Sequence, residues 1–223
     1  MTIKVIGAGG IGTALIFPLA RFLNFKKKKY IHMTVVDGDH YEKKNKKRQV
    51  FEGIGNKADI TIKKLRKEFP HLFLKAIPGY ITPQSVDYII SEGDIIFLCV
   101  DNHKTRKLVS DCCETMEDIV LISGGNKLTD GNVQIHVRQR GQNITLPIAS
   151  RLHPEIRNPK DRRPDEIGCE EQIPAEPQLI FTNLFIASLM LNAFYAYYTG
   201  SISYDEVYAD LIVNKVRSVK RNK

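Results

Sequence analysis

The chain has 223 residues, and its 43% of hydrophobic residues can supply a sizeable core, which is typical of a globular protein. A formal net charge of +8 is compatible with nucleic acid, an anionic membrane or a polyphosphate ligand, and does not choose among them. The cysteines Cys99, Cys112, Cys113 and Cys169 have neither the pattern of a disulfide ladder nor that of paired C-x-x-C knuckles. We therefore expect a reducing cytoplasmic location and no structural zinc.

Strand-like and helix-like patterns alternate along the first half of the chain. A buried strand over residues 3–6 leads through "GAGGIG" into a helix that runs to about Leu23, with Pro18 as the place for a kink. The following expected elements are a strand at 31–36, a helix at 56–68, a strand at 72–77, a helix at 83–93, a strand at 94–100, a helix at 104–116 and a strand at 118–123. This alternation predicts an α/β fold with a doubly wound, Rossmann-like and mostly parallel sheet.

The second half breaks this rhythm. Residues 124–140 suggest two strands around an Asp130-Gly131 turn, and a polar, proline-rich segment follows over about 147–177. An apolar helix at 179–198 precedes a last strand at 206–216 and a basic tail. We therefore expect antiparallel strands in the C-terminal half, and a single domain over 1–223 with a nucleotide-binding half at 1–125 and a second half at 126–223.

The stretch "LIFTNLFIASLMLNAFYAYY" at 179–198 has no charge and is long enough to span a bilayer. Its polar residues Thr182, Asn183, Ser188 and Asn192, and its place at the end of an α/β pattern, favour a buried helix. The N-terminus starts on a strand without the charged and apolar regions of a signal peptide, so we expect no export and no membrane span.

Gly7, Gly9 and Gly12 form G-x-G-x-x-G directly after a strand and at the start of a helix. In that context the glycines let the backbone approach a phosphate, and the helix N-terminus offers free N–H groups. Asp37, at the end of the second expected strand, is placed to accept hydrogen bonds from a ribose. A glycine-rich turn without a ligand remains an alternative, and so does a nicotinamide or flavin dinucleotide site.

The basic segment beyond Asp37 favours a triphosphate over a dinucleotide, because the glycine turn already neutralises a two-phosphate bridge. Asn45 and Arg48 are three residues apart and would project from one face of a helical turn, and Lys57 opens the next helix. The other lysines of this segment, at 43, 44, 46 and 47, are interpreted as solvated. The absence of interleaved aromatic residues argues against nucleic acid as the partner.

Asp101 directly follows the fourth expected strand, where the crevice of a doubly wound sheet opens. A carboxylate facing phosphates is repulsive unless a divalent cation lies between them, and Mg²⁺ prefers one or two carboxylates together with phosphate oxygens. We therefore predict Asp101 as a magnesium ligand. The alternative is that Asp101 is the N-cap of the helix that follows.

Five motifs in this order resemble the ThiF/MoeB/HesA family, the adenylating domains related to ubiquitin-activating enzymes. They are "GAGGIG", "VDGD", Asn45 with Arg48-Gln49, "GNKA" and "VDNHKTR", and they cover about the first half of the chain. The resemblance implies binding of ATP and Mg²⁺ and attack of a carboxylate on the α-phosphate, which gives an acyl-adenylate and releases pyrophosphate. The carboxylate is often the Gly-Gly C-terminus of a ubiquitin-like or sulfur-carrier protein, so that protein or a peptide is the implied partner.

The resemblance also implies roles for particular residues. The phosphates would contact the glycine turn and the basic residues, and the ribose would contact Asp37. The implied nucleotide-binding set is Gly7, Gly9, Gly10, Gly12, Asp37, Asp39, Asn45, Arg48, Gln49 and Lys57. Arg48, Lys57 and Asp101 would act in catalysis, with Asp101 on the metal, and no acid or base on the enzyme is required.

The sequence departs from the family pattern at two further places besides the missing zinc knuckles. Only Met1 and Thr2 precede the first strand, so the sequence leaves open whether this chain supplies the arginine that family members can provide to a partner subunit's site. Cys169 lies where some relatives carry a cysteine that takes the activated acyl group or sulfur. Glu170 and Glu171 beside it would raise the pKa of its thiol, which disfavours that role.

The sequence thus predicts an adenylyltransferase that acts as a homodimer and buries the apolar helix at 179–198. An NAD(H)-dependent oxidoreductase is one alternative, which the Asn45, Arg48, Lys57 and Asp101 set disfavours. A non-catalytic relative that only binds a partner protein is the other, and the presence of Arg48 and Asp101 disfavours it.

Overall fold

A computed structural model describes residues 1–26, 30–42, 53–166 and 178–221. The predicted site residues Asn45, Arg48, Gln49 and Cys169 lie outside these ranges. The strands are β1 (Thr2–Ile6), β2 (His32–Val36), β3 (His40–Tyr41), β4 (Gly55–Asn56), β5 (Phe73–Ile77), β6 (Ile95–Leu98), β7 (Ile119–Asn126), β8 (Asp130–Gln139), β9 (Gln142–Asn143), β10 (Glu206–Asp210) and β11 (Lys215–Val219). The helices are α1 (Gly10–Phe25), α2 (Lys57–Glu68), α3 (Val86–Ile89), α4 (His103–Glu114), α5 (Pro154–Arg157), the 3-10 helix η2 (Pro164–Glu166) and α6 (Ile180–Tyr198).

One large sheet organises the fold, in the order β11-β10-β8-β7-β6-β1-β2-β5, with β9 paired to β8. The five strands from β7 to β5 in this order are parallel, and β8, β10 and β11 add antiparallel pairings. The predicted α/β class, with a mostly parallel sheet and antiparallel strands in the C-terminal half, is confirmed. Strand order reverses between β1 and β6, as expected for the crevice of a doubly wound sheet.

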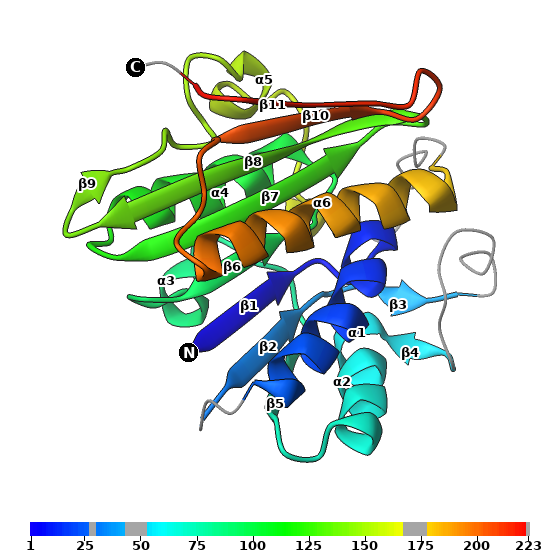
Figure 1. Ribbon diagram of the computed structural model, residues 1–223. Helices are drawn as coiled ribbons and strands as arrows, with labels where there is room; N and C mark the ends of the chain where they lie inside the picture. Colours follow the sequence, from blue (N-terminus) through cyan, green and yellow to red (C-terminus); the bar gives the residue numbers. More distant parts are fainter. Residues whose placement is uncertain (27–29, 43–52, 167–177, 222–223) are drawn as a thin grey trace.

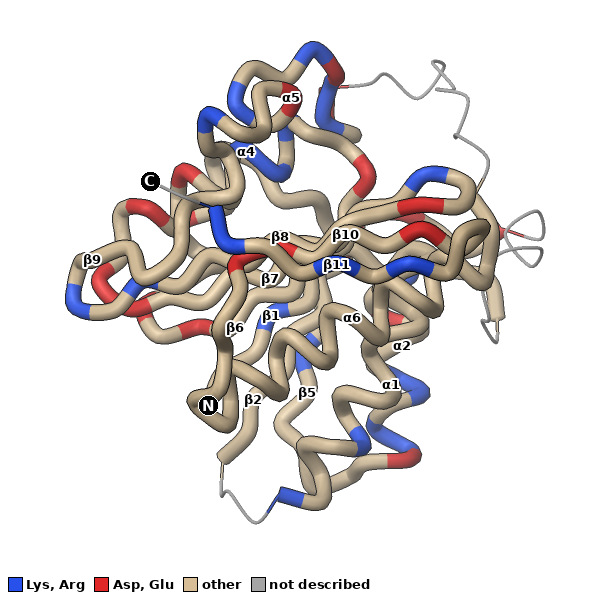
Figure 2. Tube along the Cα trace, turned by 45° about the horizontal axis from the view of Figure 1, so that its top comes forward, with Lys and Arg blue, Asp and Glu red and all other residues tan. Residues whose placement is uncertain are grey.

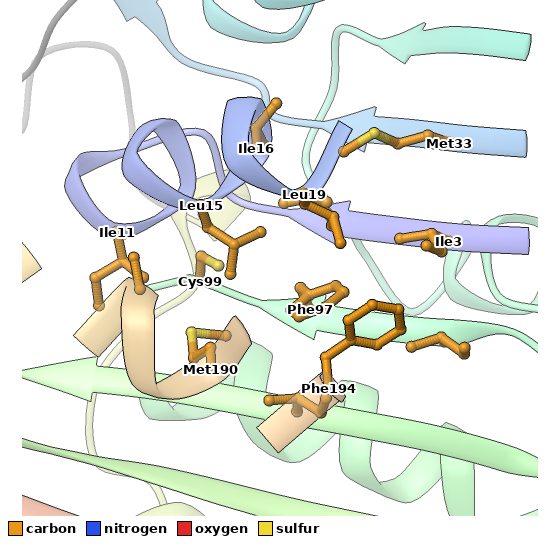
Figure 3. Close-up of a cluster of buried hydrophobic side chains, with 14 of the residues drawn as sticks. Ile3, Ile11, Leu15, Ile16, Leu19, Met33, Phe97, Cys99, Met190 and Phe194 are labelled. Atoms are coloured by element: carbon orange, nitrogen blue, oxygen red, sulfur yellow. The ribbon is translucent and has the colours of Figure 1, made fainter. Parts of the chain in front are cut away.

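Helices cover both faces of the sheet (Figure 1). The core on one face is formed with α1, α2 and α6, and the core on the other face is formed with α3 and α4. Leu15 and Leu19 of α1, Phe97 of β6, and Met190 and Phe194 of α6 point toward one another and are buried (Figure 3). Burial of each such side chain stabilises the fold by about 1.5–3 kcal/mol, so these helices are held on the sheet chiefly by apolar contact.

Three local expectations are wrong. The helix expected at 83–93 is only the short α3, because Ser91, Glu92 and Gly93 form a turn in which Asp94 accepts a hydrogen bond from the Ser91 N–H. The β7-β8 turn lies at 127–129, so that β7 runs on to Asn126 and Asp130-Gly131 already belongs to β8. The last expected strand is a hairpin of β10 and β11, turned at Asn214 with a positive φ of 50°. The polar segment at 147–177, for which the sequence predicted no element, contains α5 and η2 within its described part.

The apolar helix α6 lies beside α1 on the sheet (Figure 1). It is the one helix of the described chain that is long and apolar enough to cross a membrane. Its inner side chains Ile186, Ala187, Met190, Ala193 and Phe194 belong to the core. This packing supports the interpretation of 179–198 as a core helix.

Candidate nucleotide-binding site

The glycine turn connects β1 to α1 at the point where β2 and β6 end. Gly7 has a positive φ of 94°, and a Cβ on it would lie 2.9 Å from the carbonyl carbon of Cys99. A Cβ on Gly12 would lie 2.0 Å from the carbonyl oxygen of Gly7. Both positions therefore require glycine, and the turn packs closely against the end of β6.

The N-terminus of α1 begins at Gly10 and has no side-chain cap. Gly9 is the N-cap residue and has no side chain to accept a hydrogen bond from the first-turn N–H groups. Uncapped N–H groups at the start of a helix of this length form a site that favours anions. Gly10 packs against Asn183 of α6, because a Cβ on Gly10 would lie 2.2 Å from Nδ2 of Asn183.

Asp37 follows β2 and is buried beside the turn. Its carboxylate accepts hydrogen bonds from the N–H of Ala8 (2.6 Å) and from the N–H of Asp39 (2.8 Å). Burial raises the pKa of Asp37, and the nearby Lys57 opposes that shift. Asp37 thus links the glycine turn to the "VDGD" segment, and whether it also binds a ribose stays a prediction.

Asp39 and Lys57 form an ion pair next to Asp37. The Lys57 ammonium lies 2.7 Å from Oδ2 of Asp39, and Lys57 is the first residue of α2, as the sequence predicted. Asn56 caps α2 by accepting hydrogen bonds from the N–H groups of Ala58 and Asp59. The short strands β3 and β4, which the sequence analysis missed, bring these two segments together beyond the end of β2 (Figure 1).

Asp101 lies at the carboxyl end of β6 and is exposed. It is not the N-cap of α4, because that cap is Asn102, whose side chain accepts a hydrogen bond from the Thr105 N–H at 2.8 Å. The N-cap alternative for Asp101 is therefore wrong, and its carboxylate is available for another role. The described residues contain no group of three or more His, Cys, Asp or Glu side chains that could hold a metal ion by themselves.

Three contributors to this region escaped the sequence analysis. Arg106 is buried and donates to the carbonyls of Val100 and Gly124, both at 2.8 Å. Asp161 accepts hydrogen bonds from the N–H groups of His103 (2.5 Å) and Lys104 (3.0 Å) at the start of α4. The Tyr80 hydroxyl donates to Asp39. Arg106 stands inside the "VDNHKTR" motif and could have been suspected, whereas Asp161 and Tyr80 carry no local signal.

The described cysteines are free and unsuited to nucleophilic chemistry. Cys99, Cys112 and Cys113 are buried. Burial raises the pKa of Cys99 to about 12 and that of Cys112 to about 11. Thiols with such pKa values carry almost no thiolate at neutral pH. Cys99 belongs to the core and Cys112 and Cys113 to α4, and Cys169 lies outside the described residues.

The sequence profile of the ThiF family matches residues 1–217. The chain belongs to the ThiF family. Among curated relatives, the adenylyltransferase and sulfurtransferase uba4 of Pyricularia oryzae is 30% identical over 136 residues, covering 59% of this chain and 26% of the relative. The adenylyltransferase and sulfurtransferase MOCS3 of Drosophila sechellia is 28% identical over 139 residues, covering 60% of this chain and 29% of the relative. The aligned part of this ThiF-family chain thus spans little more than a quarter of either relative.

Solved structures share the fold. A crystal structure of PaaA matches with a TM-score of 0.71 at 16% identity, covering 98% of this chain and 63% of PaaA. A crystal structure of E. coli MccB with ATP matches with a TM-score of 0.70 at 15% identity, covering 98% of this chain and 63% of MccB. A crystal structure of E. coli MccB with MccA matches with a TM-score of 0.70 at 15% identity, covering all of this chain and 65% of MccB. At these identities the likeness establishes the fold of this ThiF-family chain.

Proposed function

We propose that this chain is an ATP-dependent adenylyltransferase. It activates the C-terminal carboxylate of a small ubiquitin-like or sulfur-carrier protein, or of a peptide, as an acyl-adenylate. One observation carries the proposal: in a chain of the ThiF family, the uncapped N-terminus of α1, Asp37, Lys57 and Asp101 gather around the ends of β1, β2 and β6. The names of the curated relatives support the same activity.

In this proposal the phosphates of ATP bind at the glycine turn, through Gly9, Gly10 and the first-turn N–H groups of α1. Asp37 accepts hydrogen bonds from the ribose, and Asn45, Arg48 and Lys57 contact the phosphates. Asp101 would hold Mg²⁺ together with phosphate oxygens, which fits a site with one exposed carboxylate and no cluster of protein ligands among the described residues. When bound, the ion neutralises charge on the phosphates.

The reaction needs orientation and charge stabilisation more than proton transfer. An oxygen of the partner's carboxylate attacks the α-phosphorus, and the bond from that phosphorus to the oxygen bridging to the β-phosphorus breaks. Pyrophosphate leaves with the electron pair, and a mixed anhydride of the acid and AMP remains. Both the nucleophile and the leaving group are anions, so the contribution of Arg48 and Lys57 is to stabilise the negative charge around the α-phosphorus.

The partner, the assembly and the location belong to the proposal as well. E. coli MccB has been crystallised with MccA, which supports a peptide or small protein as the partner of this chain. Exposed apolar side chains on α6, among them Phe181 and Leu184, support a homodimer. The buried free thiols of Cys99, Cys112 and Cys113 suit a reducing cytoplasm.

The test has a binding arm and an exchange arm. We expect calorimetry to show binding of ATP with Mg²⁺ and no binding of NAD(H). We expect ATP–pyrophosphate exchange only when a small protein ending in Gly-Gly, encoded beside this chain, is added. Binding of NAD(H) without affinity for ATP-Mg²⁺ would replace the proposal with an oxidoreductase, and partner binding without exchange would indicate a non-catalytic relative.

A further inference from the structure

Tyr80 lies in the segment between β5 and α3 and reaches across to the "VDGD" segment. A Cβ on Gly38 would lie 2.7–2.8 Å from three atoms of the Tyr80 ring, so the ring packs directly on the Gly38 backbone. The Tyr80 hydroxyl donates a hydrogen bond to Oδ1 of Asp39. The glycine between the two aspartates thus makes room for an aromatic ring that no sequence motif pointed to.

Asp39 is held from several sides. Its N–H donates to Oδ1 of Asp37 at 2.8 Å, and its carbonyl accepts from the N–H of Lys57 at 2.8 Å and from Nδ2 of Asn56 at 3.2 Å. With Tyr80 on Oδ1 and Lys57 on Oδ2, both carboxylate oxygens have a donor. The side chain of Asp39 is therefore fixed in position although half of it is exposed.

The fixed carboxylate of Asp39 also restricts the side chain of Lys57. A lysine side chain is flexible, and holding it in one geometry costs rotamer entropy. The ion pair with Asp39 already orders the Lys57 side chain before ATP binds. The stem of Lys57 is also buried, since only 7% of the residue is exposed. An ammonium group has three N–H donors, so one bond to Asp39 still leaves donors for phosphate oxygens.

We propose that Asp39 and Tyr80 are positioning residues for Lys57, and that neither has to contact the nucleotide. Asp39 orients the Lys57 ammonium for the phosphates of ATP, and Tyr80 holds Asp39 through its hydroxyl and through its packing on Gly38. This inference rests on the proposed function. It predicts the sign of an effect: removing the negative charge of Asp39 weakens the binding of ATP, although that charge by itself repels phosphate.

A double-mutant cycle with Lys57 tests this role by calorimetry with ATP-Mg²⁺. We expect Asp39→Asn to weaken ATP affinity about tenfold, the effect of one charge-assisted hydrogen bond. In a Lys57→Met background the same change is expected to cause no weakening, because no ammonium remains to be oriented. Unchanged or tighter ATP binding in Asp39→Asn would show that Asp39 competes for Lys57, and would overturn the proposal. Wild type that binds no ATP-Mg²⁺ would instead refute the proposed function.

Variants at Tyr80 separate orientation from folding. Tyr80→Phe keeps the ring on Gly38 and loses only the hydroxyl, so we expect about threefold weaker ATP binding with little change in the midpoint of thermal unfolding. Gly38→Ala should be disruptive because the new Cβ meets the ring, and Tyr80→Ala in the same chain should restore folding but not affinity. A Tyr80→Phe variant with a lower unfolding midpoint and wild-type ATP affinity would make Tyr80 a purely structural residue.

Discussion

Asp101 follows β6 on a loop whose shape depends on the buried side chain of Arg106. The guanidinium bonds the carbonyls of Val100 and Gly124, and also the hydroxyl of Ser123 at 3.2 Å. Burial lowers the pKa of Arg106, and the charge of Asp101 opposes that shift. A buried cation and the cap at Asn102 therefore fix the backbone of Asp101, which leaves its carboxylate exposed for a ligand.

For Asp101 we expect a substitution to slow the chemical step while ATP binding is retained. Asp101→Asn should lower ATP–pyrophosphate exchange by at least about a hundredfold, because a few kcal/mol of transition-state stabilisation depend on the ion it would hold. Calorimetry should still detect ATP. Asp111→Asn is the matched control: Asp111 lies on α4, the helix that follows Asp101, pairs with Lys107 in solvent and should leave exchange unchanged. Wild-type exchange in Asp101→Asn would remove Asp101 from the mechanism.

Arg48 should fail differently from Asp101. Its cation would touch the phosphates in the ground state as well as in the transition state, so Arg48→Ala should weaken ATP binding along with turnover. The same calorimetric and exchange measurements report both quantities. Full ATP affinity in Arg48→Ala would contradict a role in the ground state.

At the scale of the element, α6 leaves part of its apolar surface exposed to solvent in the single chain. It carries no charged residue along its length (Figure 2). Phe181, Leu184 and Tyr195 are 64%, 51% and 53% exposed, while the opposite side of the helix is in the core. Exposed apolar side chains gathered on one helix face are typical of an interaction site.

We expect the protein to stay in the soluble fraction without detergent and to be a dimer by light scattering. Leu184→Arg should give a monomer, because a charge would be buried at the interface. Tyr88→Arg on α3, at a position 87% exposed, is the control and should remain dimeric. A wild-type monomer would refute the dimer, and consistent partition into membranes would overturn the core-helix interpretation.

At the scale of the whole molecule, buried titratable groups tie the C-terminal half together. His153 bonds Glu155 at 2.9 Å and Glu206 of β10 at 3.0 Å. Burial alone would lower the pKa of His153, but the two carboxylates raise it; burial alone would raise the pKa of Glu206, but His153 lowers it. His136 of β8 is different: burial, with Arg138 and Arg221 nearby, lowers its pKa to about 4.

Stability should therefore be highest near neutral pH. The His153 contribution is complete below its usual pKa and is lost as pH rises through the raised pKa of the folded state, and the Glu206 contribution is lost as pH falls through its lowered pKa. His136 resists protonation, so on the order of 3 kcal/mol is lost as pH falls from about 6.5 to about 4. Urea unfolding across pH checks this: His136→Gln should flatten the acid side and His153→Gln the alkaline side. An acid side unchanged in His136→Gln would contradict the assignment.

The elements of the first half of the chain could be predicted from the sequence because their signals are local. Apolar runs predict the buried strands, and the glycines at 7, 9 and 12 and the acid at position 37 are recognised within a few residues of a strand. The places of Gly7 and Gly12 in the turn and of Lys57 at the start of α2 were predicted for this reason. The hairpin of β10 and β11 was missed because its turn at Asn214 carries no glycine or proline.

The sequence by itself thus determined the class of fold, the family and the place where strand order reverses, since hydrophobic periodicity and turn geometry depend on neighbouring residues. Only the tertiary structure decided which side chains meet there. Tyr80 reaches Asp39 across 41 residues, and Asp161 reaches the start of α4 across 58. Contacts over such separations form when packing of the whole core brings distant segments together, so no local pattern encodes them.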